Sequence, residues 1–243
     1  MADATIVVGV TTKSVSEFLA EKGLTAPPLT ERTPTLGYGA NGAPSSLKGK
    51  YSLEKFPRPA VFPVLKGELG DFEIVYAAHF VSNGTMPATI HHSPGANSDV
   101  YVNYLDDEEL ARMHDSEGIG FLYESVNIND IDLRLEDGSA IDSISVYVDL
   151  YGAYLVDGKP MAISKVPAMP RVLPDGDHFA VLSDVKLRVN HPGTVFSFAL
   201  ENVQSADLRS ERTEAIRSNC TPFDYDETEI VEGATADATP CEN

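Results

Sequence analysis

Residues 99–128, DVYVNYLDDEELARMHDSEGIGFLYESVNI, change their pattern twice. The stretch begins with β-branched and aromatic residues, which favour a strand. Asp106 and Glu109 then have the spacing of a capping box, and acidic residues crowd the first turn, where the helix dipole favours negative charge. A second strand begins near Tyr123. The stretch therefore predicts a strand, a short helix over 106–116 and another strand, with Gly118 stopping the helix.

Glu117 lies at the end of this expected helix, directly before Gly118. A carboxylate at a helix C-terminus faces the negative end of the dipole, and the nearby residues Ile119 and Phe121 are apolar. Both conditions raise the pKa of a carboxyl group toward the range useful for proton transfer. An exposed glutamate at the end of a surface helix has the same pattern, so the residues alone leave both interpretations open.

A second candidate for chemistry is the glycine-rich loop TLGYGANGAPSSLKGKY at residues 35–51. Glycine lets a ligand approach backbone N–H groups closely, so such a loop can form an anion-binding concavity. Gly, Asn, Pro and Ser are also the commonest turn formers, which leaves a plain turn as the alternative. The loop is not a GxxxxGK[ST] phosphate loop, because Tyr51 follows Lys50, and it matches a dinucleotide fingerprint only weakly.

The rest of the chain alternates between helix-like and strand-like segments. A capping box of Ser14 and Glu17 predicts a short helix over 14–22, which a proline-rich connector follows. Residues 206–218, ADLRSERTEAIRS, also read as a helix. Strands are expected at residues 71–81, 88–93, 98–105, 122–128, 131–135, 143–156, 180–189 and 194–200.

The C-terminal segment is strongly acidic. Residues 205–243 hold ten acidic residues and three arginines, a composition that favours a mobile tail over a packed one. Cys220 and Cys241 both lie in it, and we expect no disulfide framework and no metal pair from them. We divide the chain into an N-terminal strand, helix and connector (1–34), a central domain (35–204), and an acidic helix with a partly mobile tail (205–243).

The overall charge excludes several classes of partner. A net charge of −19 argues against nucleic acid and anionic membrane surfaces, which require clustered Lys and Arg. The N-terminus lacks a basic signal-peptide region and no apolar run is long enough to span a membrane, so we expect a cytoplasmic protein. His91 and His92 are adjacent in a strand and point to opposite faces, with His79 on another strand, so we expect no metal site.

Four motifs resemble, in order and spacing, those of the gamma-glutamylcyclotransferase-like family: YGAN at 38–41, MPATIHHSPG at 86–95, VYVNYL at 100–105, and LARMHDSEGIGFLYESVNI at 110–128. That family has a YGSN loop after its first barrel strand, a G-x-ATI-x-x-x-G middle segment, and an L-x-x-x-E-G segment followed by a tyrosine. The resemblance covers about half the chain, residues 35–154. It implies an α+β fold with a mixed, partly closed β-barrel and short flanking helices.

The resemblance also implies site residues. Four loop residues would bind the carboxylate end of a small-molecule amide, mainly through backbone amides: Tyr38, Gly39, Ala40 and Asn41. Glu117 would take a proton from the α-amino group, so that its nitrogen attacks the γ-carbonyl, and would then protonate the leaving amine. Tyr123 would orient the substrate or the carboxyl group. This intramolecular reaction needs orientation and proton transfer, and we expect neither a metal nor a cofactor.

The chain departs from the family pattern around the loop and the expected glutamate. Ala40 stands in place of serine, Gly42 in place of leucine and Ser125 in place of an arginine, and no arginine follows the loop before Lys48. These departures leave the substrate open. An enzyme that cyclises or cleaves an amino-acid-like amide is the leading interpretation. The alternatives are an enzyme for a urea-derived amide, as in the C-terminal domain of allophanate hydrolase, and a non-catalytic binding domain; a homodimer is also open.

Overall fold

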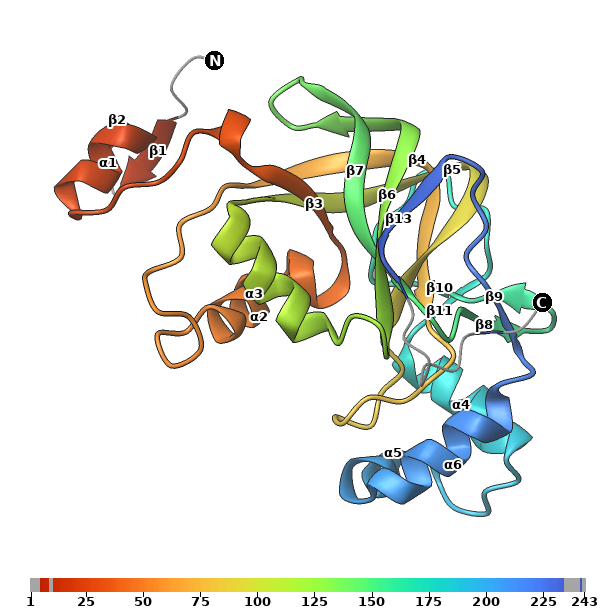
Figure 1. Ribbon diagram of the computed structural model, residues 1–243. Coiled ribbons are helices and arrows are strands. Elements are labelled where there is room, and N and C mark those ends of the chain that lie inside the picture. Colours follow the sequence, from red (N-terminus) through yellow and green to blue (C-terminus); the bar gives the residue numbers. More distant parts are fainter. Residues whose placement is uncertain (1–4, 9–10, 234–240, 242–243) are drawn as a thin grey trace.

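The computed structural model describes residues 5–8, 11–233 and 241 (Figure 1). Its strands are β1 (Thr5–Val8), β2 (Thr11–Ser14), β3 (Thr33–Gly37), β4 (Val64–Tyr76), β5 (Ala88–Leu105), β6 (Tyr123–Leu135), β7 (Ala140–Asp149), β8 (Ala153–Val156), β9 (Lys159–Pro160), β10 (Ala162–Ile163), β11 (Asp175–Gly176), β12 (Cys220–Thr221) and β13 (Thr228–Glu232). Its α-helices are α1 (Val15–Glu21), α2 (Pro44–Lys50), α3 (Asp107–Glu117), α4 (His178–Arg188), α5 (Val195–Gln204) and α6 (Ala206–Ile216). Two short 3-10 turns are η1 (Leu29–Glu31) and η2 (Gly39–Gly42).

Five strands form a closed ring. They pair in the order β4, β5, β3, β7 and β6, and β6 pairs again with β4. The pairing of β3 with β7 is parallel, whereas the other pairs of the ring are antiparallel. The expected α+β class with a mixed β-barrel is confirmed. The ring closes fully, because the beginning of β4 pairs with the end of β6.

The closing contact depends on one glycine. Gly67 of β4 pairs with Leu135 of β6, and a Cβ atom at Gly67 would lie 2.9 Å from the side chains of both Leu133 and Leu135. Real Cβ atoms do not approach neighbours that closely, so with a larger residue the ends of these two leucine side chains would have to shift. The absence of a side chain at Gly67 lets β4 and β6 meet.

Alternating side chains of these strands fill the barrel. Leu36, Leu69, Val102, Ile128 and Val146 are all fully buried in one cluster. Because successive strand residues point to opposite faces, every second residue of each strand faces this interior. The β-branched and aromatic residues that predicted strands in the sequence are therefore also the residues that make the core.

Two expected strands are helices instead. The segments 180–189 and 194–200 lie in α4 and α5, which are grouped with α6 at one end of the barrel (Figure 1). Asp177 and Thr194 cap these helices, and the buried residues Val181 and Val185 of α4 are spaced four apart. The interpretation as strands was wrong because β-branched content was given more weight than caps and helical spacing. No helix in the described part of the chain is long and apolar enough to cross a membrane.

The described part of the acidic C-terminal segment is packed. Helix α6 forms as predicted, β12 pairs with β8, and β13 pairs with β6. Phe223 and Tyr225 pack against the barrel core. Residues 234–240 and 242–243 lie outside the described residues, so the mobile tail predicted there, like the domain boundaries, stays a prediction.

Cys220 and Cys241 form a disulfide, with their Cα atoms 6.4 Å apart. The expectation that these cysteines give no disulfide was wrong. The pairing of β12 with β8 and a hydrogen bond from Cys241 N to the Leu150 carbonyl, 2.7 Å long, bring both cysteines to the same side of β8. Disulfides are rare in reducing compartments, so this bond does not favour a cytoplasmic location. The location stays a prediction.

A buried ion pair joins the start of α3 to the barrel. Arg32 Nη1 lies 2.8 Å from Glu109 Oε2, and the two side chains are 1% and 0% exposed. Arg32 also donates to the carbonyls of Pro27, Val61 and Tyr104. Glu109 in turn accepts from the backbone N–H groups of Val61 and Asp106. The hydrogen bonds of this pair therefore connect several separate segments of the chain.

Breaking this pair should strongly destabilise the fold. Arg32→Met leaves the buried Glu109 carboxylate with only the more distant Arg58, whose Nη1 lies 3.5 Å from Glu109 Oε1, and this costs up to roughly 3–5 kcal/mol of unfolding free energy. The matched control is Lys13→Met, since Lys13 and Glu21 form an ion pair whose side chains are 29% and 52% exposed. The control should cost less than about 1 kcal/mol. Urea denaturation measures both values, and equal losses in the two variants would contradict this role of Arg32.

The buried tyrosines predict a loss of stability at alkaline pH. Burial, the largest cause, raises the pKa of Tyr76 to about 12, and burial likewise raises the pKa values of Tyr147 and Tyr154. An unfolded chain releases these protons near pH ~10. Stability is therefore complete below about pH 10 and is lost as the pH rises through the folded-state values.

Urea midpoints measured at about pH 8 and about pH 11 should show this loss, and Tyr76→Phe should reduce it by removing one such group. The matched control is Tyr101→Phe, since the Tyr101 ring is 40% exposed. The same alkaline loss in Tyr76→Phe as in the wild type would contradict the contribution of Tyr76.

Candidate active site

The glycine-rich loop follows β3 and folds back onto β5. Its 3-10 turn η2 is held by a hydrogen bond of 3.0 Å from the fully buried Asn103 Nδ2 to the Asn41 carbonyl. A Cβ at Gly37 would lie 2.7 Å from that Nδ2 and 2.8 Å from the Asn41 oxygen. The glycine therefore permits a close approach of loop to strand, and the loop has a defined conformation.

The loop amides differ in what they already bind. The Asn41 N–H donates to the Tyr38 carbonyl at 3.2 Å, inside the turn. Gly39 and Ala40 are exposed and open the turn, and the first N–H groups of a helical turn have no acceptor within it. Of the three amides expected to bind a carboxylate, those of Gly39 and Ala40 are thus better placed than that of Asn41.

Glu117 is the last residue of α3, as the sequence predicted. The helix begins with the expected capping box, in which the Glu109 N–H donates to Asp106 Oδ1 at 2.9 Å. Gly118 then ends the helix in the left-handed conformation, with φ at 65°. The Glu117 side chain is only 12% exposed. Glu117 is therefore not a solvated residue at the end of a surface helix.

Lys50, the last residue of α2, brings Glu117 and the loop together. Its ammonium contacts Glu117 Oε1 in an ion pair and lies 2.6 Å from Asn41 Oδ1. The Lys50 side chain is 17% exposed. Glu117 and Asn41 are thus both within hydrogen-bond reach of one nitrogen, although they are far apart in sequence. The structure therefore brings the loop and Glu117 into contact with one side chain.

Sequence reasoning missed Lys50. A helix over residues 44–50 was not predicted, because the segment opens with Pro44 and holds serine and glycine, which also favour turns. Pro44 is in fact at the start of α2, where its missing N–H costs nothing. The sequence contained a usable signal for a cation at the site, because Lys48 and Lys50 are the first cationic residues after the loop.

Two tyrosines stand close to Glu117. The Tyr38 hydroxyl donates to the Tyr147 carbonyl, and the Tyr123 hydroxyl lies 3.3 Å from the Ala88 carbonyl. Burial is the main cause that raises the pKa of Tyr38 and of Tyr123 well above ordinary values, and the charges of Asp149 and Glu117 add to it. Both hydroxyls therefore remain protonated donors around neutral pH and share the electrostatic environment of Glu117.

Asp149, a second residue that the sequence did not single out, lies behind these tyrosines. Its Oδ2 is 3.3 Å from His79 Nδ1, and the side chains are 0% and 3% exposed. Its Oδ1 accepts the Tyr151 N–H at 2.8 Å, and its own N–H donates to Thr89 Oγ1 at 3.2 Å. Asp149 is the last residue of β7, and these contacts hold its side chain in one place.

His114 precedes Glu117 by three residues in α3, but its ring contacts Tyr147. Its Nδ1 is 3.1 Å from the Tyr147 hydroxyl. Burial lowers the pKa of His114, against the opposing effect of nearby acids, so the neutral ring is favoured. His114 therefore supports Tyr147, whose carbonyl in turn accepts from Tyr38.

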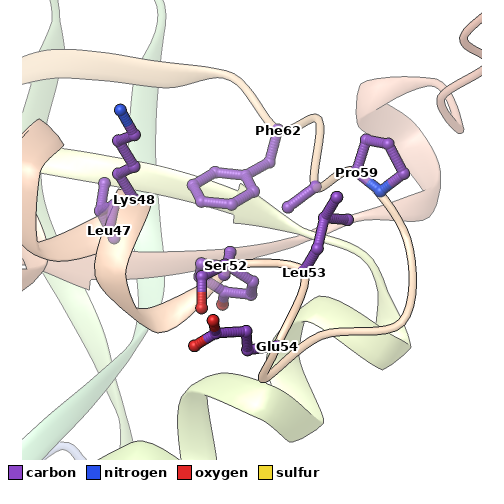
Figure 2. Close-up of a pocket in the computed structure, with 9 residues that line it drawn as sticks. Leu47, Lys48, Ser52, Leu53, Glu54, Pro59 and Phe62 are labelled. Carbon is purple, nitrogen blue, oxygen red and sulfur yellow. The ribbon is translucent and has the colours of Figure 1, made fainter.

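A surface hollow of about 700 Å³ lies beside α2 (Figure 2). Figure 2 shows Leu53, Pro59 and Phe62 around it, with Leu47 and Lys48 from α2. None of its lining residues is Glu117, Lys50 or a residue of the loop 38–41. The hollow and the candidate site thus share a helix but no lining residue.

Comparison with known proteins gives a limited result. No family model matches the chain, and no curated protein matches it. One similar solved structure is a gamma-glutamyl cyclotransferase, 17% identical at a TM-score of 0.38, covering 85% of this chain and 95% of that one. An uncharacterised protein from Homo sapiens is 19% identical at a TM-score of 0.36, covering 80% and 91%.

A third similar structure is YkqA from Bacillus subtilis, 11% identical at a TM-score of 0.38. It covers 56% of this chain, which matches only 44% of YkqA. At these identities and TM-scores the similarity assigns neither an activity nor a substrate to this chain.

The packing of the loop predicts a position-specific effect of glycine substitution. Gly37→Ala places a methyl group against the Asn41 carbonyl and Asn103, so the loop must shift, at a cost of about 1–3 kcal/mol. Gly49 is the matched control, because a Cβ there meets nothing within 4 Å. Gly49→Ala should be neutral or stabilise α2 by about 0.5–1 kcal/mol. Thermal denaturation compares the two, and a Gly37→Ala protein as stable as wild type would contradict the tight loop packing.

Proposed function

We propose that this protein is an enzyme that cyclises or cleaves an amide of an amino-acid-like small molecule, with Glu117 as general acid and base. The observation that carries the proposal is the meeting of Glu117 and Asn41 at the Lys50 ammonium. A carboxylate and an oriented glycine-rich loop are the two parts that such a reaction requires. Their convergence from distant segments supports a shared site.

The proposed reaction is a proton transfer coupled to an intramolecular attack. Glu117 accepts a proton from the substrate's α-ammonium group, and the resulting amine attacks the γ-carbonyl carbon. A new C–N bond forms, the original amide C–N bond breaks, and protonated Glu117 returns its proton to the leaving nitrogen. The attacking nitrogen gives up its second proton to the same leaving group, which departs as an ammonium ion. The products are a five-membered lactam, 5-oxoproline in the simplest case, and a free amine.

The surrounding groups have positioning roles in this proposal. The backbone amides of Gly39 and Ala40 bind the carboxylate end of the substrate. Tyr38 and Tyr123, as protonated hydroxyl groups, orient the substrate or Glu117. Substrate orientation supplies much of the rate of an intramolecular reaction, because the reacting groups already belong to one molecule.

One observation favours the alternative of a non-catalytic binding domain. Glu117 Oε1 already contacts the Lys50 ammonium, so a substrate ammonium group would have to displace Lys50 to reach that oxygen. A bound molecule would then be held by the loop and the Lys50 cation without turnover. The two functions differ in whether product forms, which an assay decides directly.

Glu117→Gln tests the catalytic role. Glutamine keeps the size and hydrogen-bonding capacity of the side chain but cannot carry the proton, so turnover should fall by roughly 10²- to 10⁴-fold. The assay incubates the protein with a panel of γ-glutamyl amides and other amino-acid amides, and follows 5-oxoproline and free amine by mass spectrometry.

Glu108→Gln is the matched control, because Glu108 belongs to the same helix and its side chain is 69% exposed. This variant should retain wild-type turnover. Equal activity of wild type and Glu117→Gln would exclude Glu117 as the proton-transfer group. Ligand binding without product formation by wild type would favour the binding domain.

A further inference from the structure

We propose that Lys50 is the specificity-determining cation of the site, and that a ligand carboxylate binds Lys50 in place of the Glu117 carboxylate. The inference rests on the proposed function, which requires a ligand with a free carboxylate. It goes beyond that function by assigning the charge recognition to a residue of α2 and by giving the ion pair a role in selecting the ligand.

The position of the Lys50 ammonium carries the inference. It lies 2.6 Å from Asn41 Oδ1, so it is beside the loop whose amides are proposed to bind the carboxylate. It also contacts Glu117 Oε1 and lies 3.6 Å from Met113 Sδ. An ammonium group has three donors, and here two of them meet oxygens of the two parts of the site.

The local structure holds this cation in place. The Lys50 carbonyl accepts a hydrogen bond of 3.0 Å from Arg112 Nε, which attaches the end of α2 to α3. Tyr51, the next residue, donates its hydroxyl to the Glu109 carbonyl at 2.7 Å. Two hydrogen bonds thus fix the backbone from which the Lys50 side chain extends, and its ammonium has little freedom to leave the site.

The exposure of the pair makes exchange of partners feasible. The Lys50 and Glu117 side chains are 17% and 12% exposed, so neither is sealed from a ligand. When a ligand carboxylate replaces that of Glu117 at Lys50, the Lys50 ammonium keeps one ion pair. Glu117 is then free to face another part of the same ligand.

An α-amino acid is the ligand class that fits both Lys50 and Glu117 once their ion pair has opened. Its carboxylate pairs with Lys50, and its ammonium group faces the released Glu117, which is the group that takes the proton. A ligand without the carboxylate cannot displace Glu117 and leaves the pair closed. The ion pair would therefore select for zwitterionic ligands and against neutral amides such as those derived from urea.

Binding measurements that need no turnover test this assignment. The probes are 5-oxoproline, which has the carboxylate, and 5-oxoprolinamide, which has the same ring without the charge. Wild type should bind the acid on the order of 10-fold more tightly than the amide, as expected for one charge-assisted hydrogen bond. Lys50→Met should remove this preference, and Lys50→Arg, which keeps the cation, should retain most of it.

Glu117→Gln should change affinity in the opposite direction. Without the competing carboxylate, Lys50 is open to the ligand, and the acid should bind about 10-fold more tightly than it binds to wild type. Lys48→Met, on the same helix but exposed, is the matched control and should behave as wild type. Isothermal titration calorimetry gives all these affinities, and circular dichroism confirms that each variant is folded.

Three results would overturn the assignment: an unchanged preference for the acid in folded Lys50→Met, no gain of affinity in Glu117→Gln, or no binding of the acid by either wild type or Glu117→Gln at millimolar concentration. The assay of turnover is separate. Charge preference without turnover contradicts the proposed catalysis alone, whereas turnover without charge preference contradicts the role of Lys50 alone.

Discussion

The buried ion pair of Arg32 and Glu109 is the interaction on which the arrangement of the site depends. Arg32 precedes the first barrel strand, and Glu109 is in the first turn of α3. The pair and its backbone partners join four segments: the proline-rich connector, the end of β5, the segment before β4 and the start of α3. These bonds hold the helix against the barrel. Removal of either charge would leave the other buried, which is far more costly than leaving an exposed charge unpaired.

The same helix transmits this placement to the candidate site. Glu117 lies eight residues after Glu109, which is roughly 12 Å along a helix. The buried pair anchors the first turn of α3, and Gly118 ends the helix after Glu117. Helix α2 packs beside α3 through Leu47, Tyr51 and Met113, which share one small core. Lys50 and Glu117 are the last residues of two short helices that pack together, and their contact follows from this packing.

The charge of the chain gives the Lys50 cation additional importance. A protein with 37 acidic and 18 basic residues repels anions as a whole. Salt screens this repulsion over about 8 Å, so a local cation in a partly buried site decides whether a carboxylate enters. Recognition of a carboxylate here thus needs a positive group within contact distance, and Lys50 is at that position.

The sequence alone determined the features that depend on neighbouring residues: the capping boxes of α1 and α3, the glycine that ends α3 after Glu117, and the runs that form β4 to β7. Caps and side-chain periods act over a few residues, so they are visible in the sequence. The ring closure at Gly67, the disulfide of Cys220 and Cys241, and the ion pair of Lys50 with Glu117 were decided by the tertiary structure. The segments of α4 and α5 carried local helix signals, the caps Asp177 and Thr194 and a four-residue spacing, but their β-branched content outweighed these signals in the prediction. Contacts between distant segments depend on how the whole chain closes upon itself, and no local pattern encodes that.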